Sequence, residues 1–375
     1  MATSTTPASK LGVYRLLSPQ ASVHVSPICL GGLSIGDKWN GRLGEMTKES
    51  SFALLDAYFD LGGNFIDTAN SYQDGTSEEF IGEWMESRGI RDQVVLATKY
   101  TSGSTIDPSI KTRVNYTGNG TKSLRLSVES SLKRLRTTYI DLLYLHWWDY
   151  ETSIREIMDS LHALVVAGKV NYLGISDTPA WVVSQANQYA LDHGKTPFSV
   201  YQGRWSVLDR DFEREIIPMA RAHGMALVPW AVLGGGKLRT DEEEKQREAS
   251  GEQQRVFYGP EWKRNEKERE VSRALEKVAQ DIGAKSIAAV AIAYVMQKTP
   301  YVFPVIGGRK IDQLKSNIEA LEISLSKEHI AFIEDAAPTD FGFLPGFIGT
   351  GSTYAMLFQP AGELARQPFA EPIKP

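Results

Sequence analysis

The apolar residues of this chain fall into short continuous runs, which alternate with longer stretches where apolar residues recur at helical spacing. Continuous runs predict strands of a parallel sheet, because such strands are buried on both faces. In the stretches between them, residues such as Phe52, Leu55 and Phe59 follow the period of a helix. The predicted strands comprise residues 28–32, 65–67, 94–99, 140–145, 170–176, 199–202, 226–230 and 301–306.

Helices are predicted between these strands and after the last one. They comprise residues 49–61, 78–88, 124–135, 154–165, 181–191, 213–223, 268–282, 286–298, 311–321 and 326–336. Eight strands, each followed by a helix, favour a closed barrel over an open doubly wound sheet. No Gly-x-Gly-x-x-Gly follows the first strand, which counts against a Rossmann fold. The sequence therefore predicts an α/β protein with a (β/α)8 TIM barrel.

The segments outside the alternation complete the expected domain plan. Residues 13–25 alternate apolar and polar side chains around a Ser-Pro-Gln turn, which predicts an N-terminal β-hairpin. Residues 1–12 are expected to be disordered, and one barrel domain is expected over residues 13–337. Residues 338–375 carry Gly, Pro and aromatics without periodicity, so they could form a disordered tail. Their many aromatics favour a loop segment that packs over the barrel mouth, near the active site.

Composition and charge narrow the class of protein. The 375 residues are 42% hydrophobic and 23% charged, with a formal net charge of −5, so no basic field attracts nucleic acid or acidic lipid. The single cysteine, Cys29, excludes an intrachain disulfide, and its apolar neighbours predict a buried thiol. The N-terminus lacks the apolar core of a secretory signal, and residues 287–296 are too few to span a bilayer. We expect a soluble cytoplasmic protein without membrane or nucleic-acid partners.

Ionisable side chains stand where three of the predicted strands end. Asp67 ends the second strand, Tyr72 follows in its loop, Lys99 ends the third strand and His146 follows the fourth. In a barrel these positions share one rim, so the four side chains are expected to converge. Taken singly, each has a plainer explanation: Asp67 and Lys99 could form a structural ion pair, and His146 could be a core histidine. Their occurrence at successive strand ends favours a catalytic site.

The four residue types suggest one kind of chemistry. A tyrosine has an ordinary pKa of about 10, and a nearby ammonium stabilises the phenolate and lowers that value. We therefore predict Tyr72 as a general acid, with Lys99 as its tuning partner and Asp67 as the carboxylate that holds Lys99. His146 would donate a hydrogen bond that orients a substrate oxygen.

Residues 64–69 and 141–146 resemble motifs of the aldo-keto reductases, whose Asp, Tyr, Lys and His tetrad occurs in this order. The resemblance runs roughly from residue 22 to residue 336. Residues 147–149 and 201–206 are most similar to fungal aryl-alcohol dehydrogenases and norsolorinic acid reductase-like enzymes. The resemblance implies a β/α barrel that reduces an aldehyde or ketone with NADPH, with Tyr72, Asp67, Lys99 and His146 as the catalytic residues.

The resemblance also implies contacts to the nicotinamide end of NADPH or NADP⁺. Ser176 and Gln202 would hold the carboxamide, and Trp230 would stack on the nicotinamide ring, although a core tryptophan is the alternative. Asp177 stands where the family often has Asn, and an ionised carboxylate can accept but not donate a hydrogen bond, so its role differs.

Two further segments are implied at the phosphate and adenosine ends. Glycines in residues 232–237 would let the backbone approach the pyrophosphate closely. After the last strand, Arg309 would bind the adenosine 2′-phosphate, although a lone arginine could equally be solvated surface. The implied contacts in these two segments are Gly234, Gly236, Lys237, Gly307, Arg309, Gln313 and Asn317.

The substrate pocket is expected in the loops, with Trp39, Trp147, Trp148 and Phe341 as candidates and without a metal site. The substrate would be aromatic, or resemble a polyketide or terpenoid. Oxidation, dehydration or isomerisation of a ring ketone or lactol in secondary metabolism is an alternative outcome at the same site. A cofactor-binding regulatory subunit, like the potassium-channel β-subunits of this fold, is a further alternative. A monomer or a homodimer is expected.

Overall fold

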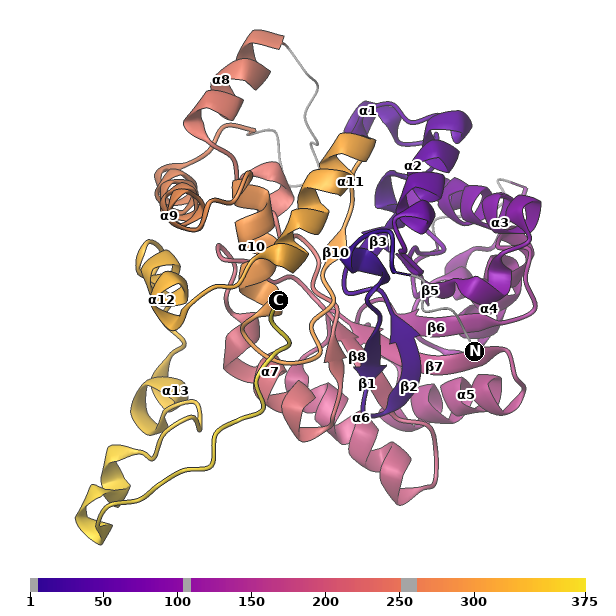
Figure 1. Cartoon of the computed structure of the whole chain (residues 1–375). Helices are drawn as coiled ribbons and strands as arrows, with labels where there is room; N and C mark the ends of the chain where they lie inside the picture. The colour runs from indigo at the N-terminus through magenta and orange to yellow at the C-terminus, as the bar shows by residue number, and fades with distance from the viewer. Residues whose placement is uncertain (1–5, 104–108, 251–261) are drawn as a thin grey trace.

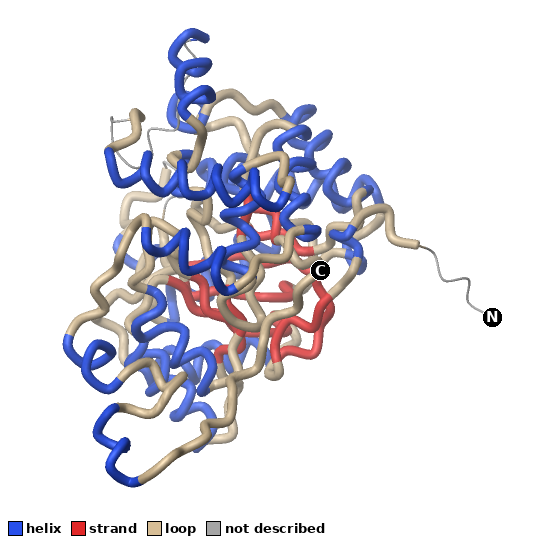
Figure 2. Tube along the Cα trace, turned by 60° about the vertical axis from the view of Figure 1, so that its left-hand side comes forward, coloured by secondary structure: helices blue, strands red, loops and turns tan. Residues whose placement is uncertain are grey.

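The computed structural model describes residues 6–103, 109–250 and 262–375. Within these residues, one sheet contains eight strands in the order β10-β3-β4-β5-β6-β7-β8-β9, all paired in parallel. The strands are β3 (Cys29–Gly31), β4 (Phe65–Asp67), β5 (Val95–Tyr100), β6 (Ile140–Leu145), β7 (Val170–Ser176), β8 (Phe198–Gln202), β9 (Ala226–Leu227) and β10 (Val305–Ile306). Figure 2 shows them gathered at the centre, with helices and loops outside. The predicted (β/α)8 architecture is confirmed.

The sheet closes where its last two strands meet. Leu227 of β9 forms a parallel bridge with Val302, shortly before β10 begins. Its amide donates to Tyr301 at 2.9 Å, and its carbonyl accepts from Phe303 at 2.8 Å. Both strands are shorter than predicted, because Pro229 and Pro304 have no amide hydrogen to donate to a ladder.

Helices surround the strands (Figure 1). Those that follow or precede the barrel strands are α2 (Lys48–Asp60), α3 (Thr76–Arg88), α4 (Thr121–Arg134), α5 (Ile154–Val166), α6 (Ala180–Asp192), α7 (Phe212–Ala222), α10 (Ile287–Met296) and α11 (Ile311–Ile318). Local sequence sets their ends: Thr47 and Ser50 form a capping box before α2, and Gly89, with φ of 64°, ends α3. The remaining helices are α1 (Asn40–Leu43), α8 (Asp241–Ser250), α9 (Glu266–Ile282), α12 (Lys327–Asp335) and α13 (Phe343–Ile348).

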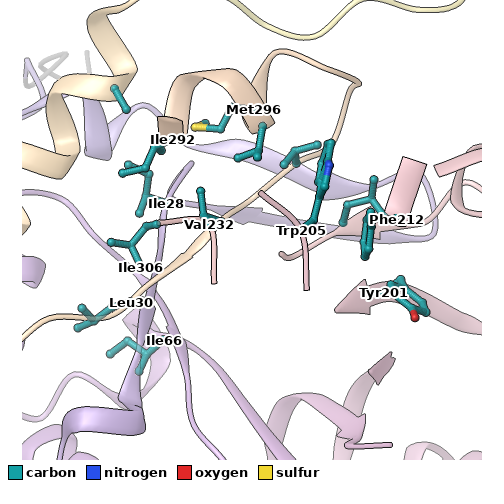
Figure 3. Packing of buried hydrophobic residues seen from close by; sticks show 14 of the residues in the cluster. Ile28, Leu30, Ile66, Tyr201, Trp205, Phe212, Val232, Ile292, Met296 and Ile306 are labelled. Carbon is teal, nitrogen blue, oxygen red and sulfur yellow. The ribbon is translucent and has the colours of Figure 1, made fainter. Parts of the chain in front are cut away.

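The core has two parts. Between the strands and the helices, Ile28, Leu30 and Ile66 pack in one large apolar cluster, and Trp205 stacks on Phe212 with ring centroids 5.2 Å apart (Figure 3). Inside the barrel, the hairpin strands β1 (Arg15–Ser18) and β2 (Ala21–Val25) supply side chains that meet Phe65, at the start of β4. The hairpin thus closes the end where strands begin, and the opposite end remains for the site.

Cys29 belongs to the inner cluster and is fully buried. Burial raises the pKa of its thiol well above the ordinary value, with the charge of Asp67 adding to the effect. The thiol is therefore held in the unreactive, protonated form, as the apolar sequence around it predicted.

The N-terminal residues are more ordered than expected. Residues 1–5 lie outside the described part of the chain, but Lys10–Gly12 form a 3-10 turn. Leu11 in this turn is 0% exposed, and the Ser9 hydroxyl donates to the carbonyl of Leu61 at 2.7 Å. The prediction of disorder is wrong for this turn, because one buried leucine in a polar stretch leaves no periodic pattern.

The C-terminal segment runs partly outside the body of the protein. After α12 it extends outward through α13 and then returns to the body (Figure 1), and Phe343 is 76% exposed. Phe369 packs on Arg221, whose guanidinium is 3.7 Å from the ring centroid. Arg221 lies in the last turn of α7, shortly before β9 starts, at the end of the barrel opposite the strand ends. Phe369 therefore anchors the last part of the segment at this end of the barrel, whereas Phe341, at its start, lies over Arg210 in the loop after β8.

The described residues contain no single helix that is both long and apolar enough to cross a membrane. Helices α9 and α10 meet the length and composition criteria only when taken together, and the chain bends by 92° between them. Most of α10 is buried in the protein core.

Candidate active site

The strand ends bring Asp67, Tyr72, Lys99 and His146 together, as their spacing predicted. Asp67 is the last residue of β4, Lys99 lies in β5, and His146 directly follows β6. The Lys99 ammonium forms an ion pair with Asp67 and donates to the carbonyl of Thr68 at 2.7 Å. It also lies 4.9 Å from the centroid of the Tyr72 ring. The rings of Tyr72 and His146 meet edge to face, with centroids 5.8 Å apart.

A strained turn holds Tyr72 in this position. The next residues, Gln73 and Asp74, have φ of 56° and 52°, in the left-handed region that side chains disfavour. The Gln73 side chain donates to the carbonyl of Leu33 at 3.0 Å, which ties the turn to the loop after β3. Gly36 in that loop permits the contact, since a Cβ there would come within 2.5 Å of Gln73. The surrounding structure therefore stabilises the unfavourable backbone that presents Tyr72.

Lys99 and Asp67 form a buried pair whose charges are well compensated. Lys99 is 0% exposed and Asp67 is 2% exposed. Burial by itself lowers the pKa of Lys99, but the carboxylate of Asp67 and the adjacent Tyr72 outweigh it, so that pKa is raised. Asp67 receives a second hydrogen bond from the Gln202 amide at 3.0 Å. Lys99 is therefore an ammonium at neutral pH.

The sign of the pKa shift at Tyr72 differs from the one expected. Burial raises the pKa of the phenol, and the Lys99 ammonium only opposes this effect. Sequence reasoning included the attraction of the ammonium but not the desolvation of the ring in a crowded rim. The consequence suits a general acid, because Tyr72 carries its proton at neutral pH.

His146 is neutral in this site. Burial lowers the pKa of its imidazole well below the ordinary value, and the positive charge of Lys99 acts in the same direction. Its Nδ1 atom is buried without a hydrogen-bond partner among the residues described. A neutral imidazole has one N–H to donate, so His146 can bind a substrate oxygen without carrying a charge.

A second group of polar side chains adjoins the first. Ser176 ends β7, Gln202 ends β8, and the Trp230 indole donates to the carboxylate of Asp177 at 3.2 Å. The Asp177 amide donates to the carbonyl of Gln202 at 3.0 Å. Since the Gln202 side chain also bonds Asp67, the two groups form one continuous site. Trp230 is only partly buried, which argues against the alternative of a core tryptophan.

The glycine-rich loop after β9 has the backbone that a phosphate site requires. Gly234, Gly235 and Gly236 have φ of 57°, 65° and 92°, in the left-handed region that favours glycine. Lys237 is placed differently from the expectation: its ammonium donates to the carbonyl of Lys263 at 2.7 Å and lies 3.4 Å from a Glu268 oxygen. In this structure the charge of Lys237 is engaged by the start of α9.

The residues after β10, which are expected to contact the adenosine end of the cofactor, differ in their exposure to solvent. Arg309 is half-buried, and its guanidinium lies so close to Gly44 that any Cβ at Gly44 would overlap it. Gly44 ends α1 with φ of 83°, so this glycine makes room for the arginine. Gln313 is exposed on α11, whereas Asn317 is 7% exposed. Gly307, directly after β10, is exposed.

The aromatic candidates for the substrate pocket divide into two pairs. Trp147 is 41% exposed and lies against His146, with ring centroids 4.4 Å apart. The Trp39 amide donates to the Gln73 side chain at 2.6 Å, which places Trp39 at the rim beside the Tyr72 turn. In contrast, Trp148 packs against the main core, and Phe341 lies over the Arg210 guanidinium at 5.6 Å. The structure thus places the Trp147 ring and the Trp39 backbone next to the tetrad, and a substrate contact of any of the four aromatics stays a prediction.

Sequence reasoning missed the residues that hold the Trp147 loop. Asn119 is 1% exposed and its amide side chain donates to the carbonyl of Trp147 at 3.1 Å. The backbone amide of Asn119 donates to Asp149 at 2.7 Å, and the Thr101 hydroxyl donates to the Asn119 side chain at 2.8 Å. These are contacts between separate βα loops, so no local spacing in the sequence could have revealed them.

The arrangement can deliver a proton to an oxygen that lies between Tyr72 and His146. It offers a protonated phenol, a neutral imidazole and an ammonium held by a buried carboxylate. In the part of the chain that the structure describes, no group of three or more His, Cys, Asp or Glu residues is placed to hold a metal ion.

Comparisons with known proteins agree with this architecture. Residues 27–338 match the aldo/keto reductase family. The chain is 55% identical over 377 residues to an NADP(+) aryl-alcohol dehydrogenase of Phanerodontia chrysosporium, covering 98% of this chain and 97% of that protein. It is 52% identical over 346 residues to the norsolorinic acid reductase of Aspergillus flavus, covering 92% and 86%. Norsolorinic acid reductase B of Dothistroma septosporum is 52% identical over 335 residues, covering 89% and 84%. This chain belongs to the aldo/keto reductase family.

Proposed function

We propose that this protein is an NADPH-dependent cytoplasmic oxidoreductase that reduces an aldehyde or ketone to the alcohol, with Tyr72 as the general acid. The observation that carries the proposal is the convergence of a protonated Tyr72 and a neutral His146 above the buried Lys99–Asp67 pair. The names of the similar proteins support an aromatic or polyketide substrate, because they act on aryl alcohols and norsolorinic acid.

The residues present fit a bound nicotinamide cofactor. The partly exposed Trp230 offers a ring face beside Gln202 and Ser176, and three consecutive glycines with positive φ offer close backbone approach. Arg309 supplies a cation at the far end, where it would favour the 2′-phosphate of NADPH. When bound, the cofactor supplies the hydride that the carbonyl carbon accepts. The role of Lys237 is less direct, since it would first have to leave Glu268.

The chain's own residues handle the oxygen of the substrate. As the carbonyl carbon is reduced, negative charge develops on its oxygen, and donors placed beforehand at that oxygen lower the barrier. Tyr72 gives its proton to this oxygen, and the Lys99 ammonium stabilises the phenolate that remains. His146 donates a hydrogen bond to the same oxygen and orients it. In the reverse direction the phenolate form of Tyr72 would accept the proton from an alcohol, so reduction and oxidation use one geometry.

An assay with substituted benzaldehydes and aryl ketones tests the proposal. The purified protein is expected to oxidise NADPH, followed by the loss of nicotinamide absorbance, with formation of the alcohol in equal amount. Product analysis with and without cofactor separates reduction from isomerisation or dehydration. If NADPH were bound but not consumed with any of these carbonyl compounds, a regulatory role would replace the proposed one.

Asp177 is expected to make cofactor binding depend on pH. Burial raises the pKa of this carboxyl to about 6, while Trp230 and the charge of Lys99 oppose the shift. Below that pH the group is neutral, and above it the carboxylate favours the positively charged nicotinamide of NADP⁺ over uncharged NADPH. We expect the affinity for NADP⁺ relative to NADPH to rise about three- to tenfold between about pH 5 and pH 8. The effect is modest because water partly screens the attraction between the Asp177 carboxylate and the nicotinamide cation.

Titrations of tryptophan fluorescence with each cofactor form measure this ratio. Asp177→Asn should make the ratio independent of pH over the same range. Asp37→Asn is the matched control, because Asp37 is an exposed carboxylate paired with Lys38 at 3.4 Å, and its loss should leave the pH dependence intact. A pH dependence that survives in Asp177→Asn would contradict the assignment.

A further inference from the structure

Tyr144 lies directly beneath the site and has no part in the mechanism above. It belongs to β6, where it pairs in register with Lys99 of β5 and Gly174 of β7. Its side chain is 0% exposed. A Cβ at Gly174 would come within 2.5 Å of the Tyr144 ring. The neighbouring strand therefore admits this ring only because it has glycine at that position.

The hydroxyl of Tyr144 is buried without a hydrogen-bond partner among the described residues. Two other buried tyrosines satisfy theirs: the Tyr58 hydroxyl lies 2.8 Å from the carbonyls of Ile28 and Phe65 and can donate to either, and the Tyr201 hydroxyl donates to the carbonyl of Thr178 at 2.8 Å. A buried polar group without a partner destabilises the folded state, because it has lost its hydrogen bonds to water. Phenylalanine would pack equally well without that cost, so the hydroxyl requires an explanation.

Three polar side chains, those of Lys99, Asp67 and Gln202, act on this hydroxyl. The Lys99 ammonium lies 5.7 Å from the centroid of the Tyr144 ring. Burial raises the pKa of Tyr144 well above its ordinary value and the charge of Asp67 raises it further, whereas the nearby amide of Gln202 opposes the shift. The hydroxyl thus keeps its proton and lies in the field of Asp67. One oxygen of Asp67 is bonded to Lys99 and the other accepts from Gln202 at 3.0 Å.

We propose that Tyr144 is a positioning residue that takes over the hydrogen bond to Asp67 when the Gln202 amide turns to a bound nicotinamide. This role rests on the proposed function, in which Gln202 holds the carboxamide. In the free protein, the Gln202 amide donates to Asp67, and the Tyr144 hydroxyl makes no hydrogen bond to the described residues. In the complex, the hydroxyl donates to Asp67, which keeps the Asp67–Lys99 pair fixed beneath Tyr72. No proton is transferred in this exchange.

Two tyrosine-to-phenylalanine variants distinguish this role from a structural one. Tyr144→Phe removes a hydroxyl that has no partner among the described residues of the free protein, so it should raise the thermal stability of the free protein or leave it unchanged. In the complex it removes a hydrogen bond, so NADPH binding should weaken about five- to tenfold. Tyr58→Phe, the matched control, should lower stability with and without NADPH and leave the affinity unchanged. Thermal unfolding and fluorescence titration of the full chain measure both quantities.

A second pair of variants tests the exchange without any cofactor. In Gln202→Leu the donor to Asp67 is lost, so the Tyr144 hydroxyl should already bond Asp67 in the free protein. Tyr144→Phe should therefore destabilise the Gln202→Leu background clearly, whereas it should not destabilise the unmodified chain. Equal effects of Tyr144→Phe on stability in the two backgrounds would overturn the exchange.

The outcomes separate this role from the proposed function. If the unmodified chain and Tyr144→Phe bind NADPH equally well, the positioning role is wrong and the proposed function stands. If the unmodified chain does not bind NADPH, both are wrong. If Tyr144→Phe lowers the stability of the free chain as much as Tyr58→Phe does, the hydroxyl is structural.

Discussion

Replacing Tyr72 with phenylalanine is expected to lower the rate of carbonyl reduction about 10²- to 10⁴-fold, the usual contribution of a positioned general acid. The Phe ring should keep the shape of the turn and still face the Lys99 ammonium. In the unmodified chain this ammonium lies 4.9 Å from the centroid of the Tyr72 ring. Only the transferable proton is removed. NADPH affinity should therefore change less than about threefold, because the residues proposed to bind it are untouched.

Single-turnover absorbance measurements and fluorescence titration test the two parts of this expectation separately. The control is Tyr150→Phe, since Tyr150 is 75% exposed and the loss of its hydroxyl should affect neither quantity. A variant Tyr72→Phe that kept near-normal rates would show that another group delivers the proton.

Replacing Lys99 with methionine is expected to affect both stability and turnover. Methionine fills most of the same volume but leaves Asp67, which is 2% exposed, as a buried carboxylate without its cation. Breaking a buried pair in this way costs about 3–5 kcal/mol in the free energy of unfolding. Turnover should fall at least as far as in Tyr72→Phe, because the phenolate loses its stabilising charge. Urea unfolding and initial rates measure the two effects.

A double variant separates the two roles of the ion pair. Lys99→Met combined with Asp67→Asn removes both charges, so most of the lost stability should return, while turnover should not. The Gln202 amide can still bond the asparagine oxygen. Recovery of turnover in the double variant would mean that the pair serves stability alone, and Lys99 would lose its place in the mechanism.

Local patterns in the sequence were enough to predict the strands, their order around the barrel, and the rim positions of Asp67, Lys99 and His146. Two rules account for this. Parallel strands buried on both faces need continuous apolar runs, and all strands of a barrel end on the same side. The positions of Asp67, Lys99 and His146 then follow from the strand ends without any knowledge of the loops, whereas that of Tyr72 also depends on the turn after β4.

Tertiary structure decided everything that depends on contacts between separate loops or on the burial of a charge. The bond from Gln202 to Asp67 joins residues 135 positions apart, and the fit of Arg309 beside Gly44 has no trace in local spacing. The C-terminal segment had no periodic pattern, so its anchor on Arg221 could not be anticipated.

Tyr72 and Lys99 illustrate the difference between what local sequence predicts and what tertiary structure decides. The pattern of strands placed a lysine at the end of one strand and a tyrosine in the loop after the neighbouring strand, so both were expected at the rim. It did not determine whether the pKa of Tyr72 would fall or rise, because that sign depends on how much water the folded rim excludes. Position along a strand is a local property, whereas desolvation is the sum over all elements that pack around the side chain, and only the folded chain supplies it.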